Sequence, residues 1–170
     1  MEKLDWTLLD ENMMTAISRE WMLVTAGTPD DCNTMTASWG GTGFLWGKPV
    51  AFVFVRPERY THEFIEKSDR LTLSFLGDAH RDVHKICGSK SGRDMDKIAA
   101  AGLSPVVLPD GGITFAQARL VMDCRKLYKA AVCPEGFVDK SLLDRWYNEQ
   151  PGGGLHDMYV VEIEAIYRNA

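Results

Sequence analysis

The stretch "PVAFVFVRPERYTHEFIEKSD", residues 49–69, predicts a strand that turns directly into a helix. Its first part is an apolar run of the kind that forms a buried strand. Thr61 is the expected N-cap, Glu63 lies in the expected first turn, and Tyr60 and Ile65 occupy the two positions of a hydrophobic staple. The helix is therefore expected to begin near Thr61.

Two arginines, Arg56 and Arg59, lie just before this expected helix. The first N–H groups of a helix have no partner inside it, and its dipole is positive at that end, so nearby cations are unfavourable unless an anion offsets them. A phosphate group would do so. The alternative is that both arginines are solvated loop residues near Glu58, and this stretch alone does not decide between the two.

The composition indicates one globular domain over residues 1–170, with 45% hydrophobic and 10% aromatic residues. The net charge of -5 and the scattered basic residues argue against nucleic acid or an anionic membrane as a partner. The acidic N-terminal sequence differs from a signal peptide and no uncharged apolar run could span a bilayer, so we expect a cytoplasmic protein. The four cysteines are isolated, which makes a zinc site or a disulfide framework unexpected.

Several short segments have the composition of strands. They are residues 21–26, 34–39, 50–55, 70–76, 113–128 and 158–168, of which 113–128 is either two strands or one long bent strand.

Short helices are expected between these strands. They are residues 78–88, with Asp78 as its cap and Gly88 at its end; 91–102, with Ser91 and Asp94 as a capping box and Gly102 after its last turn; and 137–150, ended by "PGGG" at 151–154. Regular crossover helices are missing from this pattern. The predicted fold is therefore mainly β with short helices (α+β), a closed antiparallel barrel with helices at its rim.

Two further segments could meet a polar ligand. In "NTMTASWGGTG", residues 33–43, hydroxyl side chains alternate with apolar ones, although a solvated Thr/Ser face explains the pattern better without other evidence. "GSKSGRD", residues 88–94, places hydroxyls and cations just before an expected helix start, where phosphate can bind. The alternative for this second segment is an ordinary loop and cap.

Other kinds of site find little support. His80 and His84 have the spacing of a metal-binding pair, but Arg81 stands where a zinc protease carries its Glu, and both histidines fall away from the expected apolar face. We therefore expect a surface helix and no metal. Cys133, His156 and Asp157 are present, but sequence order alone builds no catalytic triad, so a hydrolase is a weak alternative.

Five motifs resemble, in the same order, those of the flavin-reductase-like family that includes flavoredoxin. They are "NTMTASW", "VRPERYTHEFI", "SFL", "GSKSGRDMDKIAAAGL" and "HDMYVVEI", and the match covers most of residues 13–168. This resemblance implies an FMN-binding split β-barrel, usually a homodimer with the flavin near the subunit interface. The aromatic residues Trp6, Trp21, Phe44 and Trp46 would suit such an interface, although Trp21 is equally compatible with a core position.

The resemblance also implies which residues hold the cofactor. The anion of the opening stretch becomes the FMN phosphate, surrounded by Arg56, Arg59, Thr61, Ser89, Lys90 and Ser91. Asn33, Thr36, Ser38, Trp39 and Lys97 match positions that line the ribityl chain or the ring, and His156 matches the histidine before the last strand.

The resemblance also places Lys97 beside the flavin ring. It is expected to project from the flank of a helix that buries Met95 and Ile98, and its charge would tune the flavin ring. Residues 129–155 look longer than in the simplest family members, so the substrate side of the site cannot be carried over.

The implied function is a small flavoprotein that transfers electrons on FMN. It would be a flavin reductase or a flavoredoxin-like oxidoreductase that accepts hydride from NADH or NADPH, or single electrons from a redox protein partner. The alternative is a non-catalytic FMN-binding or scaffold protein on the same fold.

Overall fold

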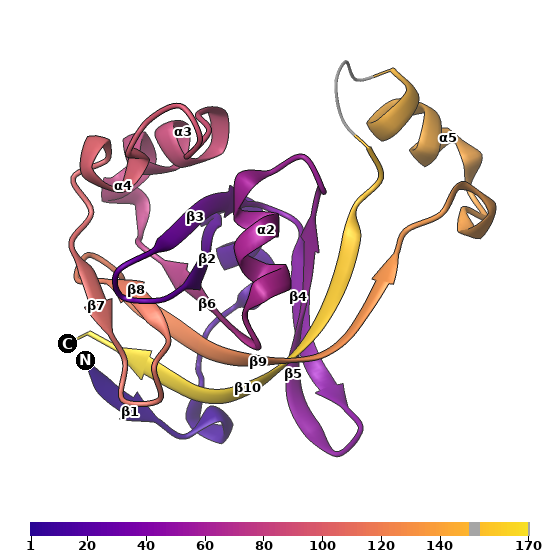
Figure 1. The fold of residues 1–170 in the computed structure, drawn as a ribbon. Coiled ribbons are helices and arrows are strands. Elements are labelled where there is room, and N and C mark those ends of the chain that lie inside the picture. The colour runs from indigo at the N-terminus through magenta and orange to yellow at the C-terminus, as the bar shows by residue number, and fades with distance from the viewer. Residues whose placement is uncertain (150–153, 170) are drawn as a thin grey trace.

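An antiparallel sheet forms the body of the protein, in a computed structural model that describes residues 1–149 and 154–169 (Figure 1). Its strands follow the order β3-β2-β6-β9-β10-β5-β4, with β1 also paired to β10, and β7 and β8 form a separate hairpin. The strands are β1 (Glu2–Leu4), β2 (Met22–Gly27), β3 (Cys32–Ala37), β4 (Gly40–Leu45), β5 (Lys48–Val55), β6 (Arg70–Phe75), β7 (Pro105–Val107), β8 (Ile113–Phe115), β9 (Leu120–Ala131) and β10 (Asp157–Arg168).

This architecture confirms the mainly β fold with short helices. The hydrogen-bonded path stays open between β3 and β4 in the described ranges, so the structure does not show the closed barrel that the sequence pattern predicts. The segment 113–128 resolves into two strands, β8 and β9, separated by a turn. The short strands β1, β4 and β7 have no counterpart in the sequence-based prediction, because each is short, glycine-containing or largely exposed.

The helices are short, and α2 and α3 pack against strands of the sheet. They are α1 (Met13–Thr15), α2 (Tyr60–Lys67), α3 (Arg81–Ser89), α4 (Lys97–Ala100) and α5 (Lys140–Leu143), with single turns of other helix types at Trp6–Leu8, Ala16–Glu20, Asp78–His80, Pro134–Gly136 and Asp144–Asn148. No helix within the described residues is long and apolar enough to cross a membrane.

The two faces of the sheet bury separate apolar clusters. Ile65 of α2 packs into the larger cluster, together with Phe75 and Tyr159, and all three are fully buried. The smaller cluster lies under α3 and the β7–β8 hairpin, around Cys87 and Phe115. Strand β6 contributes Leu71, Leu73 and Phe75 to the larger cluster, and Leu76, directly after the strand, belongs to the smaller one. The apolar side chains of the opening stretch therefore bind strand β5 and helix α2 to one core.

Strands β9 and β10 extend beyond the rest of the sheet and carry α5 away from the body (Figure 1). Their pairing contains irregularities between Val160 and Val161 and between Ile163 and Ala165, where local bending is expected. We call residues 132–149 the arm. The helix predicted over 137–150 is confirmed for Lys140–Asn148, while the expected end at "PGGG" falls mainly on residues 151–153, outside the described residues.

Three predicted N-caps are wrong, although α2 does begin next to Thr61, as expected. Helix α2 begins at Tyr60 with Arg59 as N-cap, and Thr61 is buried inside the first turn. Helix α3 begins at Arg81 without a cap from Asp78, and it continues through Gly88 to Ser89.

The third error concerns α4, which begins only after Asp96. That side chain accepts the Ala99 N–H at 3.0 Å, so the helix starts later than Ser91 and Asp94 suggested. As a result Lys97 is buried and Met95 is exposed, the reverse of the prediction. The predicted end is confirmed, because Gly102 has φ +65° and Leu103 N–H bonds to the Ile98 carbonyl at 3.0 Å.

His84 is the other correction, since it does not lie on a surface face. Its side chain is buried against β3, where Nδ1 lies 3.3 Å from the Thr36 hydroxyl, and its ring meets the edge of Trp21. Burial lowers the pKa of His84 to about 4, so the ring is neutral near pH 7.

Candidate functional site

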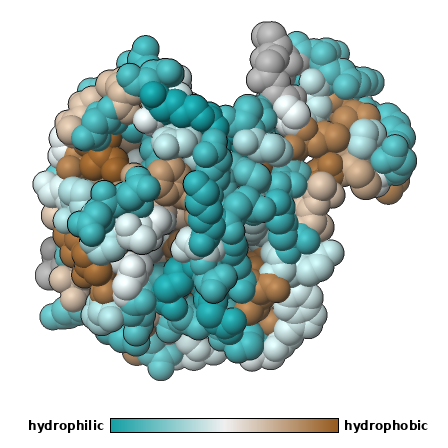
Figure 2. Space-filling model, viewed as in Figure 1, coloured by the Kyte–Doolittle hydropathy of each residue, from teal (hydrophilic) through white to brown (hydrophobic). Residues whose placement is uncertain are grey.

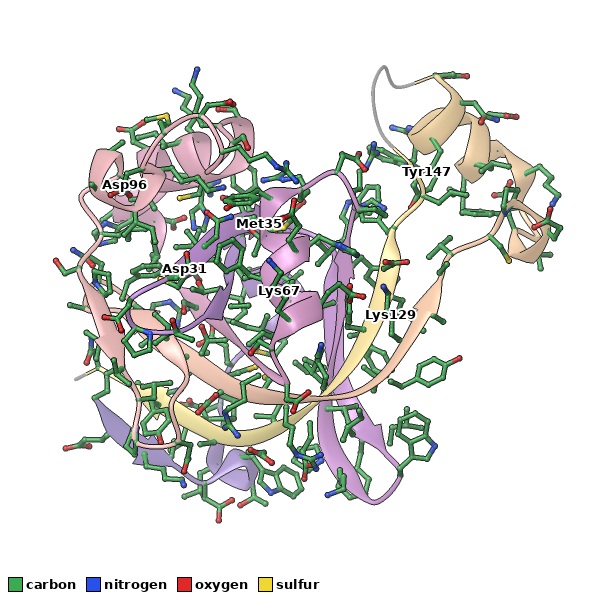
Figure 3. The ribbon with its side chains drawn as sticks, in the orientation of Figure 1. Asp31, Met35, Lys67, Asp96, Lys129 and Tyr147 are labelled. Atoms are coloured by element: carbon green, nitrogen blue, oxygen red, sulfur yellow. The ribbon has the colours of Figure 1, made fainter. Side chains whose placement is uncertain are left out.

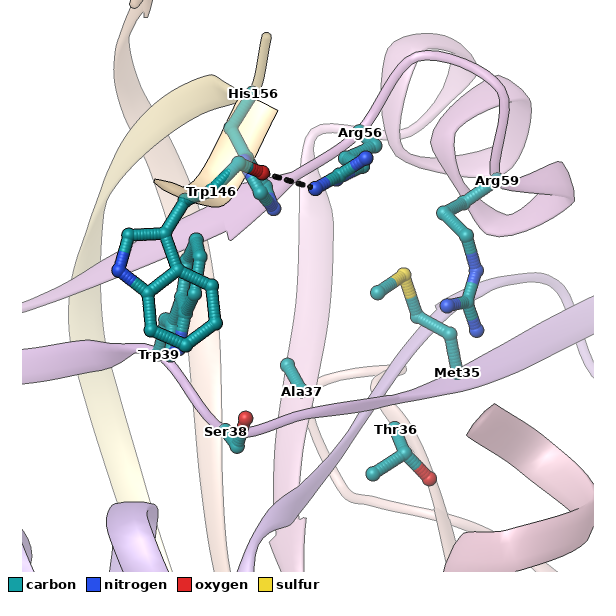
Figure 4. A pocket seen from close by; sticks show the side chains of 9 residues that line it. All are labelled: Met35, Thr36, Ala37, Ser38, Trp39, Arg56, Arg59, Trp146 and His156. Carbon is teal, nitrogen blue, oxygen red and sulfur yellow. Dashed lines mark hydrogen bonds between the residues drawn. The ribbon is translucent and has the colours of Figure 1, made fainter. Parts of the chain in front are cut away.

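Strand β3, the loop after β5 and the arm enclose a cavity of about 280 Å³, the aromatic cavity (Figure 4). The opening stretch contributes to it because β5 ends at Val55 and leaves Arg56 and Arg59 in the following loop. Its lining residues are Met35, Thr36, Ala37, Ser38, Trp39, Arg56, Arg59, Trp146 and His156. The structure thus brings together six residues that the sequence predicted, namely Thr36, Ser38, Trp39, Arg56, Arg59 and His156.

Aromatic rings form one wall of this cavity. The Trp39 ring centroid lies 5.1 Å from that of Trp146, nearly perpendicular to it, and 5.1 Å from that of His156. Tyr147 lies at the base of the arm (Figure 3), and its hydroxyl is 2.8 Å from Nδ1 of His156. Burial and then the charge of Arg56 lower the pKa of His156 to about 4, so this wall is uncharged near pH 7.

A second cavity of about 260 Å³, the basic cavity, adjoins the first at Arg59. It is lined by Glu58, Arg59, Tyr60, Gly88, Ser89, Lys90, Ser91 and Lys97. Five of these are predicted phosphate or cofactor residues, namely Arg59, Ser89, Lys90, Ser91 and Lys97. Because Arg59 lines both cavities, one elongated ligand could contact the aromatic wall and the basic loop together.

Arg59 and Lys97 are cations that donate to backbone carbonyls. Arg59 Nη2 donates to the Cys87 carbonyl at 3.0 Å, and Lys97 Nζ donates to the Cys87 and Lys90 carbonyls at 3.4 and 3.3 Å. Two acidic residues of the adjoining segment pair with other arginines, Glu58 with Arg56 and Glu63 with Arg93, although the charge of Glu58 still raises the pKa of Arg59. Within the described ranges, no carboxylate oxygen lies within 4.0 Å of the charged nitrogens of Arg59 or Lys97.

The pKa of Lys97 shows that its charged form is destabilised in this arrangement. Burial, followed by repulsion from Arg59, lowers the pKa of Lys97 to about 8. Burial also lowers the pKa of Arg59. Both shifts mean that the positive charge is poorly stabilised by the protein itself.

The backbone offsets only part of the charge. Gly88 and Ser89 end α3, and residues 90–96 form the loop that follows it, so the segment 88–94 does not lie just before a helix start, which corrects the sequence-based expectation. A helix C-terminus carries roughly half a negative charge, against two full positive charges from Arg59 and Lys97. The N-terminus of α2 adds further positive potential at Arg59 and Tyr60. The basic cavity is therefore suited to an anion.

Asn33 and Thr61 lie apart from both cavities. The Asn33 amide donates to the Thr61 hydroxyl at 2.8 Å, and both side chains are buried. A Cβ added at Gly92 would lie 2.3 Å from Asn33 Oδ1, so only glycine allows this loop to approach β3 so closely. These residues fasten α2, β3 and the basic loop together, and neither lines the aromatic or the basic cavity.

The arm supplies functional residues that sequence reasoning missed. Arg56 Nη2 donates to the Trp146 carbonyl at 3.1 Å (Figure 4), which holds Trp146 and Tyr147 at the site. The Arg56 guanidinium also lies over the Tyr147 ring, 5.5 Å from its centroid. The Trp-Tyr pair beside a predicted helix was the available signal, but its direction depends on the bend of β9 and β10. The described residues contain no group of three or more His, Cys, Asp or Glu side chains that could hold a metal ion.

Comparison with known proteins gives one family model, described as a flavin reductase like domain, which matches residues 14–170. Solved structures share the fold. An FMN-binding protein from Thermus thermophilus with bound p-hydroxybenzaldehyde is 21% identical, with a TM-score of 0.66 and coverage of 88% of this chain and 71% of that one. Flavoredoxin from Methanosarcina acetivorans is 19% identical, with a TM-score of 0.67 and coverage of 88% and 68%.

A third structure, the NADH:FAD oxidoreductase of Streptomyces globisporus in complex with NAD and FAD fragments, is 15% identical, with a TM-score of 0.63 and coverage of 88% and 74%. No curated protein matches the chain.

Proposed function

The chain belongs to the flavin reductase-like family, and on that premise we propose that it binds FMN across the aromatic and basic cavities and acts as a flavin-dependent oxidoreductase. One observation carries this proposal. Arg59 and Lys97 place two desolvated positive charges in the basic cavity, and the one acidic residue of its lining, Glu58, pairs with Arg56 and lies more than 4.0 Å from both. A phosphate dianion would offset that charge with hydrogen bonds that Ser89 and Ser91 could extend.

The aromatic cavity fits the other end of FMN. Trp39, Trp146 and neutral His156 offer flat, largely apolar walls, and Ser38 offers a hydroxyl in the lining. The Thr36 hydroxyl already donates to the His84 carbonyl at 3.0 Å, so Thr36 adds mainly a surface to the cavity. Arg56 would contribute charge where the two cavities meet. We assign Asn33 and Thr61 a supporting role, because their side chains bond to each other behind the cavities.

Bound FMN would supply the electron-transfer chemistry, and the protein would position it and exclude water. Arg59 and Lys97 would hold the phosphate, and the aromatic wall would fix the plane of the ring. The Tyr147 hydroxyl already contacts Nδ1 of the neutral His156 imidazole. Nε2 is therefore the ring nitrogen that would form a hydrogen bond with a ligand. An effect of Lys97 on the ring potential stays a prediction, since this residue lines the basic cavity.

The electron donor is part of the proposal. NADH or NADPH is one candidate donor, because a related structure is named as an NADH:FAD oxidoreductase. A redox protein is the other, because related structures are named flavoredoxin. Neither donor needs a nucleotide-binding domain of its own if it contacts only the open side of the flavin.

We further propose a homodimer. Large apolar side chains are exposed on the β4–β5 hairpin and beside it, where Phe44 and Trp46 are 64% and 59% exposed. Trp6 lies against Phe44 and Tyr128 against Trp46, which makes a continuous aromatic surface. Trp21 is half-buried against His84 and belongs to the body of the protein. Figure 2 shows a further apolar surface on the arm.

A reducing, cytoplasmic environment also belongs to this proposal. All four cysteines are free thiols, and Cys133 is exposed on the arm.

The test combines binding with anaerobic reduction. Arg59→Met is expected to weaken FMN binding by roughly tenfold or more, because it removes a charge-assisted hydrogen bond worth about 1.5–3 kcal/mol. Arg93→Met is the matched control, since Arg93 pairs with Glu63 and lines neither cavity. Equal FMN affinity in both variants would contradict the site.

The FMN-loaded protein is then mixed anaerobically with NADH or NADPH. Rapid bleaching of the flavin supports a reductase, and bleaching only by a reduced redox protein supports an electron carrier. Bound flavin that no donor reduces would indicate a non-catalytic FMN-binding protein.

A further inference from the structure

The arm forms a pocket of its own, separate from the basic cavity. This arm pocket has a volume of about 280 Å³ and is lined by Trp39, Phe137, Leu142, Trp146 and Tyr147. Trp39 and Trp146 also line the aromatic cavity, so the two spaces share a wall. Four of the five lining side chains come from the arm, and the sequence analysis assigned no role to any of them.

The lining has the chemistry of a site for flat apolar rings. The Trp39 and Trp146 rings meet edge to face at 86°, and about a third of each side chain is exposed. This arrangement leaves ring surface free for a third aromatic group. The Tyr147 hydroxyl is already paired with His156, so few polar groups remain to orient a sugar or a phosphate.

The charge of the arm argues against an anionic ligand. Residues 134–149 contain four carboxylates, Glu135, Asp139, Asp144 and Glu149, but only two cations, Lys140 and Arg145. Arg145 lies 5.1 Å over the Trp146 ring and is directed at that ring. The second cation, Lys140, donates to the Pro134 carbonyl at 2.9 Å. A neutral ligand therefore meets no electrostatic opposition here.

The pocket is held in shape by a contact to the body and by contacts within the arm. Arg56 Nη2 donates to the Trp146 carbonyl, and Phe137 packs against Tyr147 with ring centroids 5.8 Å apart. Asp139 caps α5 through the Ser141 N–H at 3.0 Å. A ligand would therefore enter a preformed space and lose little binding energy to ordering the protein.

We propose that the arm pocket is a binding site for a neutral, flat aromatic compound beside the flavin. This inference rests on the proposed function, because the shared tryptophan wall contacts two ligands only when a flavin occupies the aromatic cavity. The concave shape and the shared wall favour a small molecule over a second copy of the chain as the occupant.

The experiment is equilibrium dialysis of 2-naphthol against the FMN-loaded protein. Decahydro-2-naphthol, which has the same carbon skeleton without the flat rings, is the matched ligand. We expect one 2-naphthol per chain, bound roughly tenfold more tightly than the saturated compound. Trp146→Ala should weaken 2-naphthol binding by about tenfold, and Trp146→Phe should retain most of it because a ring is kept.

Val138→Ala is the control on the same segment, since Val138 is fully exposed and does not line the pocket. Its affinity for 2-naphthol should equal that of the wild type. Equal binding of both ligands, unchanged binding in Trp146→Ala, or equal losses in Trp146→Ala and Val138→Ala would overturn the inference. So would loss of binding together with dissociation of an oligomer, measured by sedimentation, because the apolar surface would then belong to a subunit interface.

Different results would contradict the proposed function and the arm-pocket inference. FMN titration of the same samples tests the cofactor, and dialysis of 2-naphthol against flavin-free protein tests the pocket alone. Absence of FMN binding contradicts the proposed function, whereas FMN binding without 2-naphthol binding contradicts only the arm-pocket inference.

Discussion

Replacement of Lys97 by methionine is expected to stabilise the flavin-free protein and to weaken its hold on FMN. Methionine keeps much of the apolar stem but removes the buried charge. The pKa of Lys97 falls from 10.5 to about 8 on folding. That difference corresponds to about 3 kcal/mol that the charged side chain costs the folded state near neutral pH.

The pH dependence has a defined sign. The folded chain releases the Lys97 proton near pH 8, whereas the unfolded chain keeps it to about pH 10.5. Between these values the unfolded state binds more protons, so the wild type gains stability as pH rises. Lys97→Met should lack this gain and should already be more stable at pH 7, by up to about 3 kcal/mol.

Binding of FMN should change in the opposite direction. Loss of one charge-assisted hydrogen bond to phosphate is expected to weaken binding by roughly 10-fold to 100-fold. Urea unfolding at pH 7 and pH 9.5 measures the stability, and fluorescence titration measures the FMN affinity. Lys85→Met is the control, because the Lys85 side chain is 84% exposed on α3. A variant with wild-type stability and wild-type FMN affinity would refute the reasoning.

Three further outcomes follow from the structure. Wild type should lose stability as pH falls from about 6.5 to 4, because His84 stays neutral in the folded state while the unfolded chain takes up a proton. In His84→Asn the loss of stability between pH 7 and pH 4.5, measured by urea unfolding, should be smaller. Thr61→Val should lower the free energy of unfolding by about 1–3 kcal/mol, because it leaves the buried Asn33 amide unpaired, and an unchanged urea midpoint would contradict this. The double change Arg56→Glu plus Arg59→Glu should abolish copurification of FMN, and stoichiometric flavin in that variant would mean that the site is misplaced.

The apolar pattern was sufficient to predict the general architecture. Alternation and β-branched residues mark the long strands, and the glycine at 102 marks a helix end, because these signals are local. Helix starts were predicted less well. Thr61 has the composition of an N-cap, but its hydroxyl is used by Asn33, 28 residues earlier, and no local pattern contains that contact.

The same limit applies to the site. Arg56, Arg59 and the basic loop could be named from motifs, since they lie in short segments with a recognisable order. Lys97 was placed on the wrong face because Asp96, and not Ser91, caps its helix. Trp146 and Tyr147 reach the site through the bend of two long strands, which depends on the whole sheet.

The most direct test of the central claim is a paired titration of the wild-type protein with FMN and riboflavin. The two ligands share the ring and the ribityl chain, and they differ only in the phosphate that Arg59 and Lys97 are proposed to hold. We expect FMN to bind at least roughly tenfold more tightly, with the difference reduced in high salt and in Arg59→Met. Equal affinity for FMN and riboflavin would contradict the assignment of the basic cavity as the phosphate site.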